Sequence, residues 1–491
     1  MPTRVLDVGD SEDSRVFLVE TQGQCGQYTA LSHCWGESNS FLTTRDTLEE
    51  MKGGFMLEQT PATFRDAIII TRKLGIRYLW IDSLCIIHGD TKDWETESSK
   101  MGEVYRDAYL TIGASNASSD VEGFLKPRLL ACSSLKVVFP GGMTHQIYLL
   151  DTTDQRYSND DRERFLDEPL ITRGWTLQEA YLSRRQLKFM KHQIVLDCQE
   201  HLKEESACPD GPDFDKINGG AESLGKLYPS RENDFLPIYG GWYEMIQKYS
   251  QRKVTFHSDR LPALSGLAKL TATHQNGNYL AGLWWEDIAL GLCWRGEYRE
   301  RFIKPDCYVA PSWSWASVVG SVRFSGPSHS SLDISPLRQV TFKNYGLHYR
   351  GDSHFGQVEG GWIRVSAPLA LFTYMALGED AKAWNILTIG VHPTTVNAGA
   401  CLDFDQQETE DLRLLFLLRE EHDSEGRSSY RDEAEFGGIV IKMERELSKE
   451  TYKDLPLHAG KRQVYKRVGY FYMGDAFDIE LDELVSEIFL I

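Results

Sequence analysis

Apolar residues in the first two hundred positions fall into short runs that alternate with segments of helical spacing. Residues 27–35 form a short apolar run that ends at Gly36, which predicts a buried strand. The segment 60–75 opens with threonine and proline, carries apolar residues at helical spacing and ends in glycine, which predicts a capped helix. Residues 76–87 form a second apolar run interrupted by Asp82, which is typical of a strand covered on both faces.

The same alternation continues toward residue 200. Asp93 opens and caps a further segment of helical spacing, and residues 109–114 form a third strand-like run. Residues 173–182 indicate a turn that enters a helix, and residues 186–197 indicate another strand. Strands that alternate with helices are typical of right-handed crossovers in a parallel sheet. We therefore expect an α/β domain with a mainly parallel sheet flanked by helices, in which residues 76–82 form a central strand.

Residues 151–168 are charged and loop-like. The pattern changes beyond residue 200, where residues 200–235 are polar and indicate a connector, and residues 235–294 have helical periodicity. From Trp313 onward, short strand-like runs separated by turns indicate a twisted antiparallel sheet or a small barrel. We predict an α/β domain, a connector with a helical region and a β-rich domain, covering residues 1–199, 200–310 and 311–491.

Composition and charge restrict the function classes. The chain has 491 residues, which is too long for one hydrophobic core. A net charge of -19 argues against nucleic acid and anionic membrane surfaces as partners. Residues 1–7 lack the apolar core of a signal peptide, and no uncharged apolar stretch approaches the ~20 residues of a membrane helix. The nine cysteines are scattered and lack a Cys-x-x-Cys pair, so we expect a cytoplasmic protein with reduced thiols.

Polar residues that follow apolar strands are the first candidates for chemistry, because parallel α/β sheets bind ligands beyond their strand carboxyl ends. Ser32, Asp82 and Glu179 could converge there. Residue types alone favour a plainer interpretation, in which Ser32 caps a helix, Asp82 bonds a backbone amide and Glu179 is exposed. The three segments that carry these residues are 31–36, 79–85 and 173–179.

Other kinds of site are less well supported. Zinc is not expected, because no known zinc spacing matches His33, Cys34, Cys85 and His88. A nucleophilic pair of Cys85 with a histidine is disfavoured, since buried strand cysteines are usually inert. The segment around Ser265 lacks the nucleophile elbow of an α/β-hydrolase. We expect Trp313 and Trp315 to lie in the core.

In this order and at these distances, the three segments resemble the heterokaryon incompatibility (HET) domain of filamentous fungi. The resemblance runs from about Tyr28 to Phe189 and includes Asp93–Glu95, Met101, Tyr105 and Ala108–Ile112. Three later segments resemble the region that follows this domain in such proteins: Asp259–Gly266, Tyr279–Trp284 and Ala310–Ser317. The chain departs from the family at His88, where Gln is more frequent, and at His33, where Tyr is common.

The resemblance implies a role in non-self recognition and programmed cell death, and a TIR-like, flavodoxin-like fold. Many TIR domains hydrolyse NAD+ with a glutamate in a Trp-Cys-Leu-x-Glu segment, whose spacing Trp175–Glu179 shares. The resemblance thus implies that Glu179 is catalytic and stabilises the ribosyl cation formed when the nicotinamide–ribose bond breaks. NAD+ would be a substrate, not a cofactor. Its binding residues would be Ser32, Trp35, Gly36, Asp82, Arg173 and Trp175, with Trp35 or Trp175 stacked on a base.

Three functions remain open at this point. The first is an NAD+ glycohydrolase whose C-terminal regions control the α/β domain. The second is a non-enzymatic signalling module that self-associates or recruits an incompatibility partner, and the third is a recruited biosynthetic enzyme that uses the same crevice. The intact spacing from Trp175 to Glu179 favours the first, because a purely interacting module would not need it.

Overall fold

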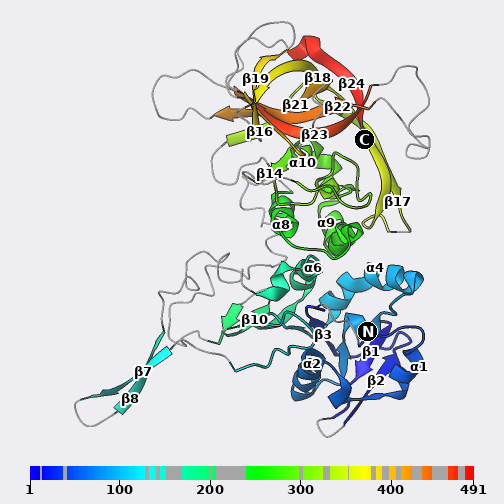
Figure 1. The fold of residues 1–491 in the computed structure, drawn as a ribbon, viewed down its shortest axis with the longest axis vertical. Coiled ribbons are helices and arrows are strands. Elements are labelled where there is room, and N and C mark those ends of the chain that lie inside the picture. The colour runs from blue at the N-terminus through cyan, green and yellow to red at the C-terminus, as the bar shows by residue number, and fades with distance from the viewer. Residues whose placement is uncertain are drawn as a thin grey trace. The chain divides into compact units, whose positions relative to one another are not determined.

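The structure is a computed structural model whose chain divides into two compact units, residues 1–228 and residues 229–491 (Figure 1). The predicted loop 151–168 and connector 200–235 lie almost entirely outside the described residues. No described helix is long and apolar enough to cross a membrane. The described residues are 1–10, 14–36, 41–127, 132–139, 144–150, 168–191, 193–198, 202–205, 239–297, 302–324, 332–351, 353–376, 383–389, 398–404, 411–422, 434–444, 463–473 and 481–491.

The first unit is built on a nine-stranded sheet whose four central strands run parallel. Across the sheet they stand in the order β9-β6-β3-β5, so β3, which comes first in the chain, lies between β5 and β6. This is the 2-1-3-4 order of flavodoxin-like doubly wound sheets. The four strands are β3 (Tyr28–Ser32), β5 (Tyr78–Trp80), β6 (Leu110–Gly113) and β9 (Arg185–Phe189).

Antiparallel strands extend both edges of this sheet, so the sheet is mixed and not mainly parallel as predicted. The run 186–197 is a hairpin and not one strand, because the chain reverses where the Met190 amide donates to the Gln193 carbonyl at 3.0 Å. The edge strands are β1 (Arg4–Asp7), β2 (Arg15–Glu20), β4 (Phe55–Met56), β10 (Ile194–Cys198) and β11 (Leu202–Glu204). A separate antiparallel ribbon consists of β7 (Cys132–Val138) and β8 (Thr144–Leu150).

Helices connect the parallel strands and cover the sheet (Figure 1). Asp90, and not Asp93 as predicted, caps α4, because its side chain accepts hydrogen bonds from the amides of residues 92 and 93. Asp93 instead pairs with Arg4 at 2.6 Å. Thr60 does not cap α2 either, since its hydroxyl donates to the Leu57 carbonyl. The helices of this unit include α1 (Leu48–Gly53), α2 (Ala62–Lys73), α4 (Thr91–Asp107) and α6 (Trp175–Leu182).

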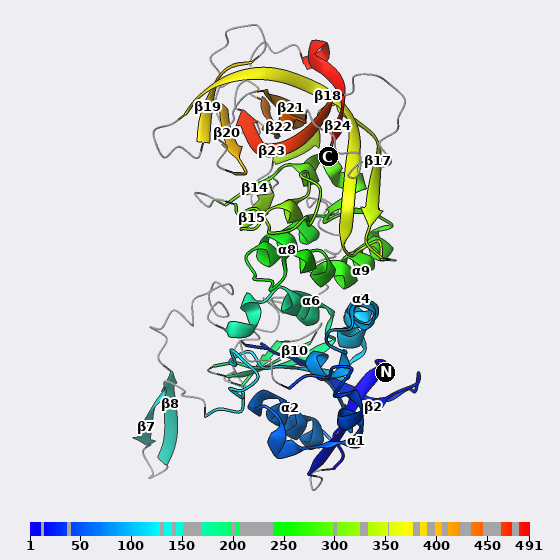
Figure 2. The same ribbon diagram turned by 45° about the vertical axis from the view of Figure 1, so that its right-hand side comes forward.

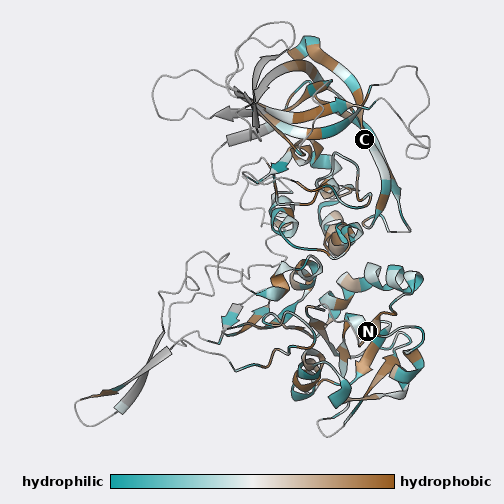
Figure 3. Ribbon diagram, viewed as in Figure 1, coloured by the Kyte–Doolittle hydropathy of each residue, from teal (hydrophilic) through white to brown (hydrophobic). Residues whose placement is uncertain are grey.

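The apolar run 76–87 contains a shorter strand than predicted. β5 ends at Trp80, and the chain turns into the one-turn helix α3 (Asp82–Cys85). Asp82 begins this turn, and its Oδ1 accepts a hydrogen bond from the Ser83 amide at 2.7 Å. Leu79 and Ile81 are fully buried, as expected for an interior strand. Hydrophobic residues concentrate in the central strands of this unit, whereas the outer turns of its helices are more hydrophilic (Figure 3).

The second unit begins with a helical layer, as predicted from the periodicity of residues 235–294. Its three α-helices among the described residues are α8 (Gly240–Ser250), α9 (Ser265–Gln275) and α10 (Ile288–Leu292). Trp313 and Trp315 are fully buried, which confirms their place in the core, although Trp315 begins a 3-10 turn and not a strand. The tryptophans that fill this core are Trp242, Trp284, Trp294, Trp313 and Trp315.

The strands from residue 332 onward form a small barrel, which is one of the two arrangements predicted for this region (Figure 2). Six strands form a closed ring in the order β18-β21-β22-β23-β20-β19, and β19 pairs again with β18. β17 (Thr341–Tyr349) and β24 (Val485–Leu490) add to β18, while β16 (Leu332–Pro336) adds to β21. The ring strands are β18 (Val358–Ala376), β19 (Ala383–Ile389), β20 (Ala398–Leu402), β21 (Leu412–His422), β22 (Ala434–Met443) and β23 (Val464–Met473).

Candidate functional site

The carboxyl ends of β3 and β5 bring together the residues that the sequence singles out. Ser32 is the last residue of β3, and Asp82 follows β5 by two residues. Glu179 lies in α6, which precedes β9. The Ser32 hydroxyl donates a hydrogen bond to Oε2 of Glu179, so β3 and α6 are joined by a direct side-chain contact. The plainer interpretation of an exposed Glu179 and a helix-capping Ser32 is therefore wrong.

The carboxyl group of Glu179 lies in a buried environment that favours its neutral form. Glu179 is only 4% exposed. The pKa of Glu179 is raised to about 7, chiefly because burial disfavours the charged form; the nearby charge of Asp82 also raises it, and the opposing effects of Ser32, Arg173 and Tyr105 do not cancel the rise. Glu179 is thus close to half-ionised at neutral pH, which is the range in which a carboxyl group can both give and accept a proton.

Asp82 organises the second part of the site. Its Oδ2 accepts a hydrogen bond from the Trp35 indole at 2.8 Å, and its Oδ1 lies 3.8 Å from Nδ1 of His33. Burial lowers the pKa of His33 to about 4, so the imidazole is neutral at pH 7 and does not form an ion pair with Asp82. The His33 ring packs edge-on against Phe64 at 5.1 Å. Asp82 therefore fixes the indole of Trp35 beside the end of β3.

Arg173 and Trp35 form the more accessible part of the site. The Arg173 guanidinium donates to the backbone carbonyl of His33 and lies 5.8 Å from the centre of the Trp35 ring. Both side chains are half-buried. Trp175, at the first position of α6, is half-buried and packs against the hydrophobic core of this unit. The site thus places a fixed cation and an indole next to buried carboxyl groups.

Gly36 is the residue at which the chain leaves the site. Its φ of +78° lies in the left-handed region, and a Cβ there would approach the Ser119 Cβ to 2.4 Å. The glycine therefore permits both the backbone conformation and the close approach of the loop that contains Ser119. Gly36 contributes backbone shape near the site, and its predicted role in binding stays a prediction.

Two residues of the site were not predicted as site residues. Tyr105 in α4 donates to the Leu31 carbonyl at 3.1 Å and also interacts with Glu179. Asp120 is almost fully buried, and burial together with the charge of Asp82 raises its pKa. Tyr105 lies at helical spacing within the segment that follows Asp93, and Asp120 ends a run of small polar residues, so neither carries a sequence signal of a site. Both are brought to the site by tertiary packing, which periodicity does not encode.

Several buried polar atoms around Asp82 lack a hydrogen-bond partner within the described part of the chain. They are Nε2 of His33, Oγ of Ser83 and Oδ1 of Asp120. Unpaired buried polar atoms are costly, and they cluster where a ligand supplies the missing partner. All three belong to residues that adjoin Asp82 in the chain or interact with its charge, so they leave hydrogen-bonding capacity for a polar ligand in this region.

The thiols near the site are poorly suited to nucleophilic chemistry. Burial raises the pKa of Cys34 to about 11 and that of Cys85 to about 12, so both remain protonated at neutral pH. Within the residues that the structure describes, no three His, Cys, Asp or Glu side chains are grouped as metal ligands. The site is therefore a carboxyl, hydroxyl and aromatic arrangement.

Comparison with known families identifies the region that contains this arrangement. Residues 28–179 match the family described as heterokaryon incompatibility protein (HET). The matched region begins at the first residue of β3 and ends at Glu179, so it contains every predicted site residue. Neither the curated proteins nor the solved structures include a match to the chain. Residues 28–179 of the first unit are thus similar to the heterokaryon incompatibility family.

Proposed function

We propose that this protein is a heterokaryon incompatibility factor in regulated cell death, and that its first unit cleaves the nicotinamide–ribose bond of NAD+. The HET match supports the first part of the proposal. The hydrogen bond between Ser32 and Glu179 carries the second part, because it holds a carboxyl group beside the carboxyl end of β3. The strand order also supports it, since β3 lies between β5 and β6 where the direction of winding reverses, and ligands of doubly wound sheets bind there.

Glu179 would act on the charge that develops during bond cleavage. When the bond from ribose C1′ to nicotinamide breaks, its electron pair leaves with nicotinamide and a positive charge develops on the ribose. The ionised carboxylate of Glu179 would stabilise this charge. Water then adds to C1′ and gives up its proton, which Glu179 can accept because burial raises the pKa of its carboxyl group to about 7. The products are nicotinamide, ADP-ribose and a proton.

Arg173 and Trp35 would orient the substrate. A guanidinium binds phosphate oxygens in a bidentate manner, and an indole offers a flat face to a base. Because Glu179 is buried, side chains near it would have to move for the ribose to reach the carboxylate, and the half-buried pair of Arg173 and Trp35 is the accessible part of the site. We therefore expect a movement of Arg173 or Trp35 on substrate binding.

The decisive experiment incubates the purified full chain with NAD+ and measures free nicotinamide by chromatography. We expect nicotinamide release by the wild type and a loss of about a hundred- to a thousand-fold in the E179Q variant. The matched control is E97Q, because Glu97 is equally buried and also accepts a hydroxyl hydrogen bond, from Thr3 at 2.8 Å, but lies outside the site. The control should retain full activity.

Two outcomes would contradict the proposed cleavage. If the folded wild type releases no nicotinamide, the non-enzymatic signalling module becomes the better interpretation of the HET domain. If E179Q and E97Q release nicotinamide equally well, the chemistry does not depend on Glu179. In the first of these cases, calorimetric binding of NAD+ without release of nicotinamide would support the binding site and reject the reaction.

A further inference from the structure

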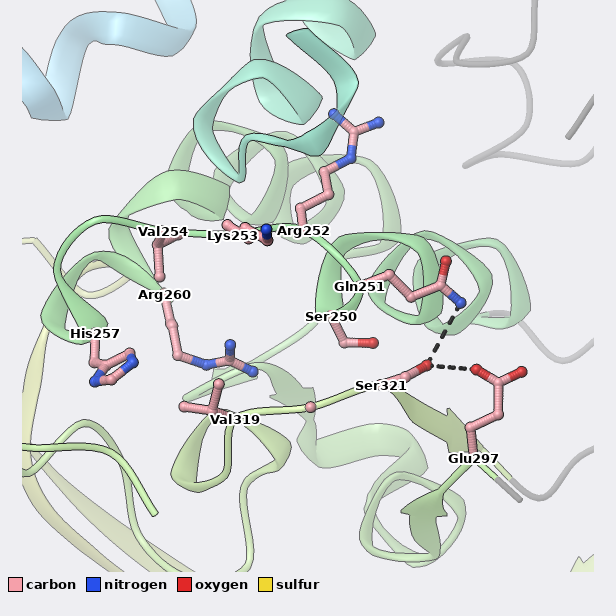
Figure 4. A pocket seen from close by; sticks show the side chains of 11 residues that line it. Ser250, Gln251, Arg252, Lys253, Val254, His257, Arg260, Glu297, Val319 and Ser321 are labelled. Carbon is pink, nitrogen blue, oxygen red and sulfur yellow. Dashed lines mark hydrogen bonds between the residues drawn. The ribbon is translucent and has the colours of Figure 1, made fainter. Parts of the chain in front are cut away.

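A cavity lies in the second unit, next to the segment that follows α8 (Figure 4). Its volume is about 510 Å³. One wall consists of residues 250–254, and His257 and Arg260 lie beside it. Glu297 and residues 319–321 line the opposite wall. All of these residues belong to the second unit, so this cavity is independent of the Glu179 site.

Arg260 is the notable group in this cavity. Arg260 is only 2% exposed, and its Nε and Nη2 atoms have no hydrogen-bond partner among the described residues. The side chain extends toward Val319, and its guanidinium lies 5.3 Å from the centre of the Trp315 ring (Figure 4). An arginine stays protonated even when it is buried. A buried cation without a counter-ion is strongly unfavourable, so the unpaired guanidinium calls for an anion.

The neighbouring side chains do not supply that anion. Glu297 forms an ion pair with Arg323 and accepts a hydrogen bond from the Ser321 hydroxyl at 2.8 Å. His257, on the other side, pairs with Asp306 at 2.7 Å. Burial lowers the pKa of Arg260, and no carboxylate contributes to that pKa. The counter-ion of Arg260 is therefore absent from the described part of the protein.

The charge of the lining indicates what kind of anion fits. The buried Arg260 and the exposed Lys253 bring positive charge to the lining, whereas the negative charge of Glu297 is already paired with Arg323. This excess matches a dianionic phosphate better than a single carboxylate, and a guanidinium fork binds two phosphate oxygens at once. The cavity is also larger than a bare phosphate ion needs and falls in the size range of sites for small organic molecules.

We propose that this cavity binds a small organic phosphate, with the phosphate held by the buried guanidinium of Arg260. Lys253 is exposed at the same wall and adds attraction from the rim. Val254 and Val319 provide apolar contacts for the organic part of the ligand. Arg260 belongs to the segment Asp259–Gly266, so the site gives this part of the chain a ligand-binding role that does not depend on the reaction at Glu179.

Binding can be measured on the full chain by titration calorimetry with ribose 5-phosphate, at constant ionic strength. Ribose is the matched neutral ligand, and inorganic phosphate and acetate are the matched anions. We expect saturable binding of ribose 5-phosphate, competition by inorganic phosphate and no binding of ribose. Absence of saturable binding by both ribose 5-phosphate and inorganic phosphate would overturn the proposal, as would tighter binding of acetate than of ribose 5-phosphate.

Variants separate a binding role from a structural one. R260M keeps an unbranched, shorter side chain and removes the charge, so affinity should fall at least tenfold while the melting temperature of the ligand-free chain stays equal or rises. R260K keeps the charge but loses the bidentate fork, so it should also weaken binding. It provides the test if R260M fails to fold. R338M is the control, because Arg338 is an exposed arginine in the same unit. Unchanged affinity in R260K and R260M would refute the role of Arg260.

Discussion

The Ser32 hydroxyl donates a hydrogen bond to the Glu179 carboxylate, although the two residues are 147 positions apart in the chain. The contact stabilises the ionised form of Glu179 and opposes the effect of burial, which favours the neutral form. The ionisation of Glu179 therefore depends on the end of β3 as well as on its own helix. Three of the predictions below follow from residues at this end of the sheet.

Replacement of Ser32 by alanine should raise the pKa of Glu179 further, because it removes a donor that stabilises the carboxylate. If the carboxylate is the active form, the rising limb of the pH–rate profile of nicotinamide release moves to higher pH. The rate should recover at alkaline pH, which a general structural defect would not produce. T3A is the control, because Thr3 donates to Glu97 in the same way outside the site. A profile that stays in place or moves to lower pH would contradict this role of Ser32.

Glu179 should make the stability of the first unit depend on pH. Its pKa is about 7 in the folded chain against an ordinary value of 4.5, so the native state binds more protons between these values. The free energy of unfolding should therefore fall as pH rises from about 4.5 to about 7, by up to about 3 kcal/mol. E179Q should lack this decline, as measured by urea unfolding at a series of pH values. Parallel curves for the variant and the wild type would disprove the assignment.

Gly36 should tolerate alanine poorly. A Cβ at this position lies 2.4 Å from the Ser119 Cβ, which is attached to the backbone and cannot rotate away. G75A is the matched control, because Gly75 has a similar φ of +69° and no atom lies within 4 Å of an added Cβ. G75A should cost only the backbone strain of roughly 1 kcal/mol, whereas G36A should cost several times more. Equal melting temperatures for the two variants would show that the loop with Ser119 adjusts freely.

The buried ion pair of Asp403 and Arg467 should be important for the second unit. Both side chains are almost fully buried, and the Arg467 guanidinium also lies 3.3 Å from the centre of the Trp294 ring. D403N leaves the buried arginine without a counter-charge, so we expect a loss of about 3 kcal/mol in denaturant unfolding. D482N is the control, because Asp482 pairs with Arg338 at the surface and its loss should have little effect. Equal effects of the two changes would argue against a stabilising role of the buried pair.

In the first unit, hydrophobic runs predicted the presence of strands more reliably than the residues at which the strands end. The runs that contain β3 and β6 are predicted correctly, because strands that are buried along their whole length appear in the sequence as mainly apolar runs. The run 76–87 was read as one strand, but burial alone does not distinguish a strand from a buried helical turn, and the chain turns at Asp82. Asp90 and Asp93 are both plausible caps three residues apart, and only tertiary contacts decide that Asp93 pairs with Arg4.

The candidate site was predictable to a similar extent. That Ser32 and Asp82 approach one another follows from the topology of a parallel sheet, because strand carboxyl ends share one edge, whereas Glu179 reaches them from helix α6. The burial of Glu179 was not foreseen, since it depends on how α6 packs against α4 and β3. The isolation of Arg260 could not be predicted either, because the absence of a partner is a property of the whole fold.

The long strand β18 has a consequence for how the barrel opens. Within its 19 residues it pairs with β17, β24, β21 and β19 in turn, so it joins both ends of the ring and the strands added outside it. No strand of the ring can detach at a free edge, because a closed sheet has none. The amide hydrogens of β18 that bond to β24 or β21, within residues 363–367 and 369–371, should therefore exchange with solvent only when the whole barrel unfolds, which makes the barrel a single cooperative unit.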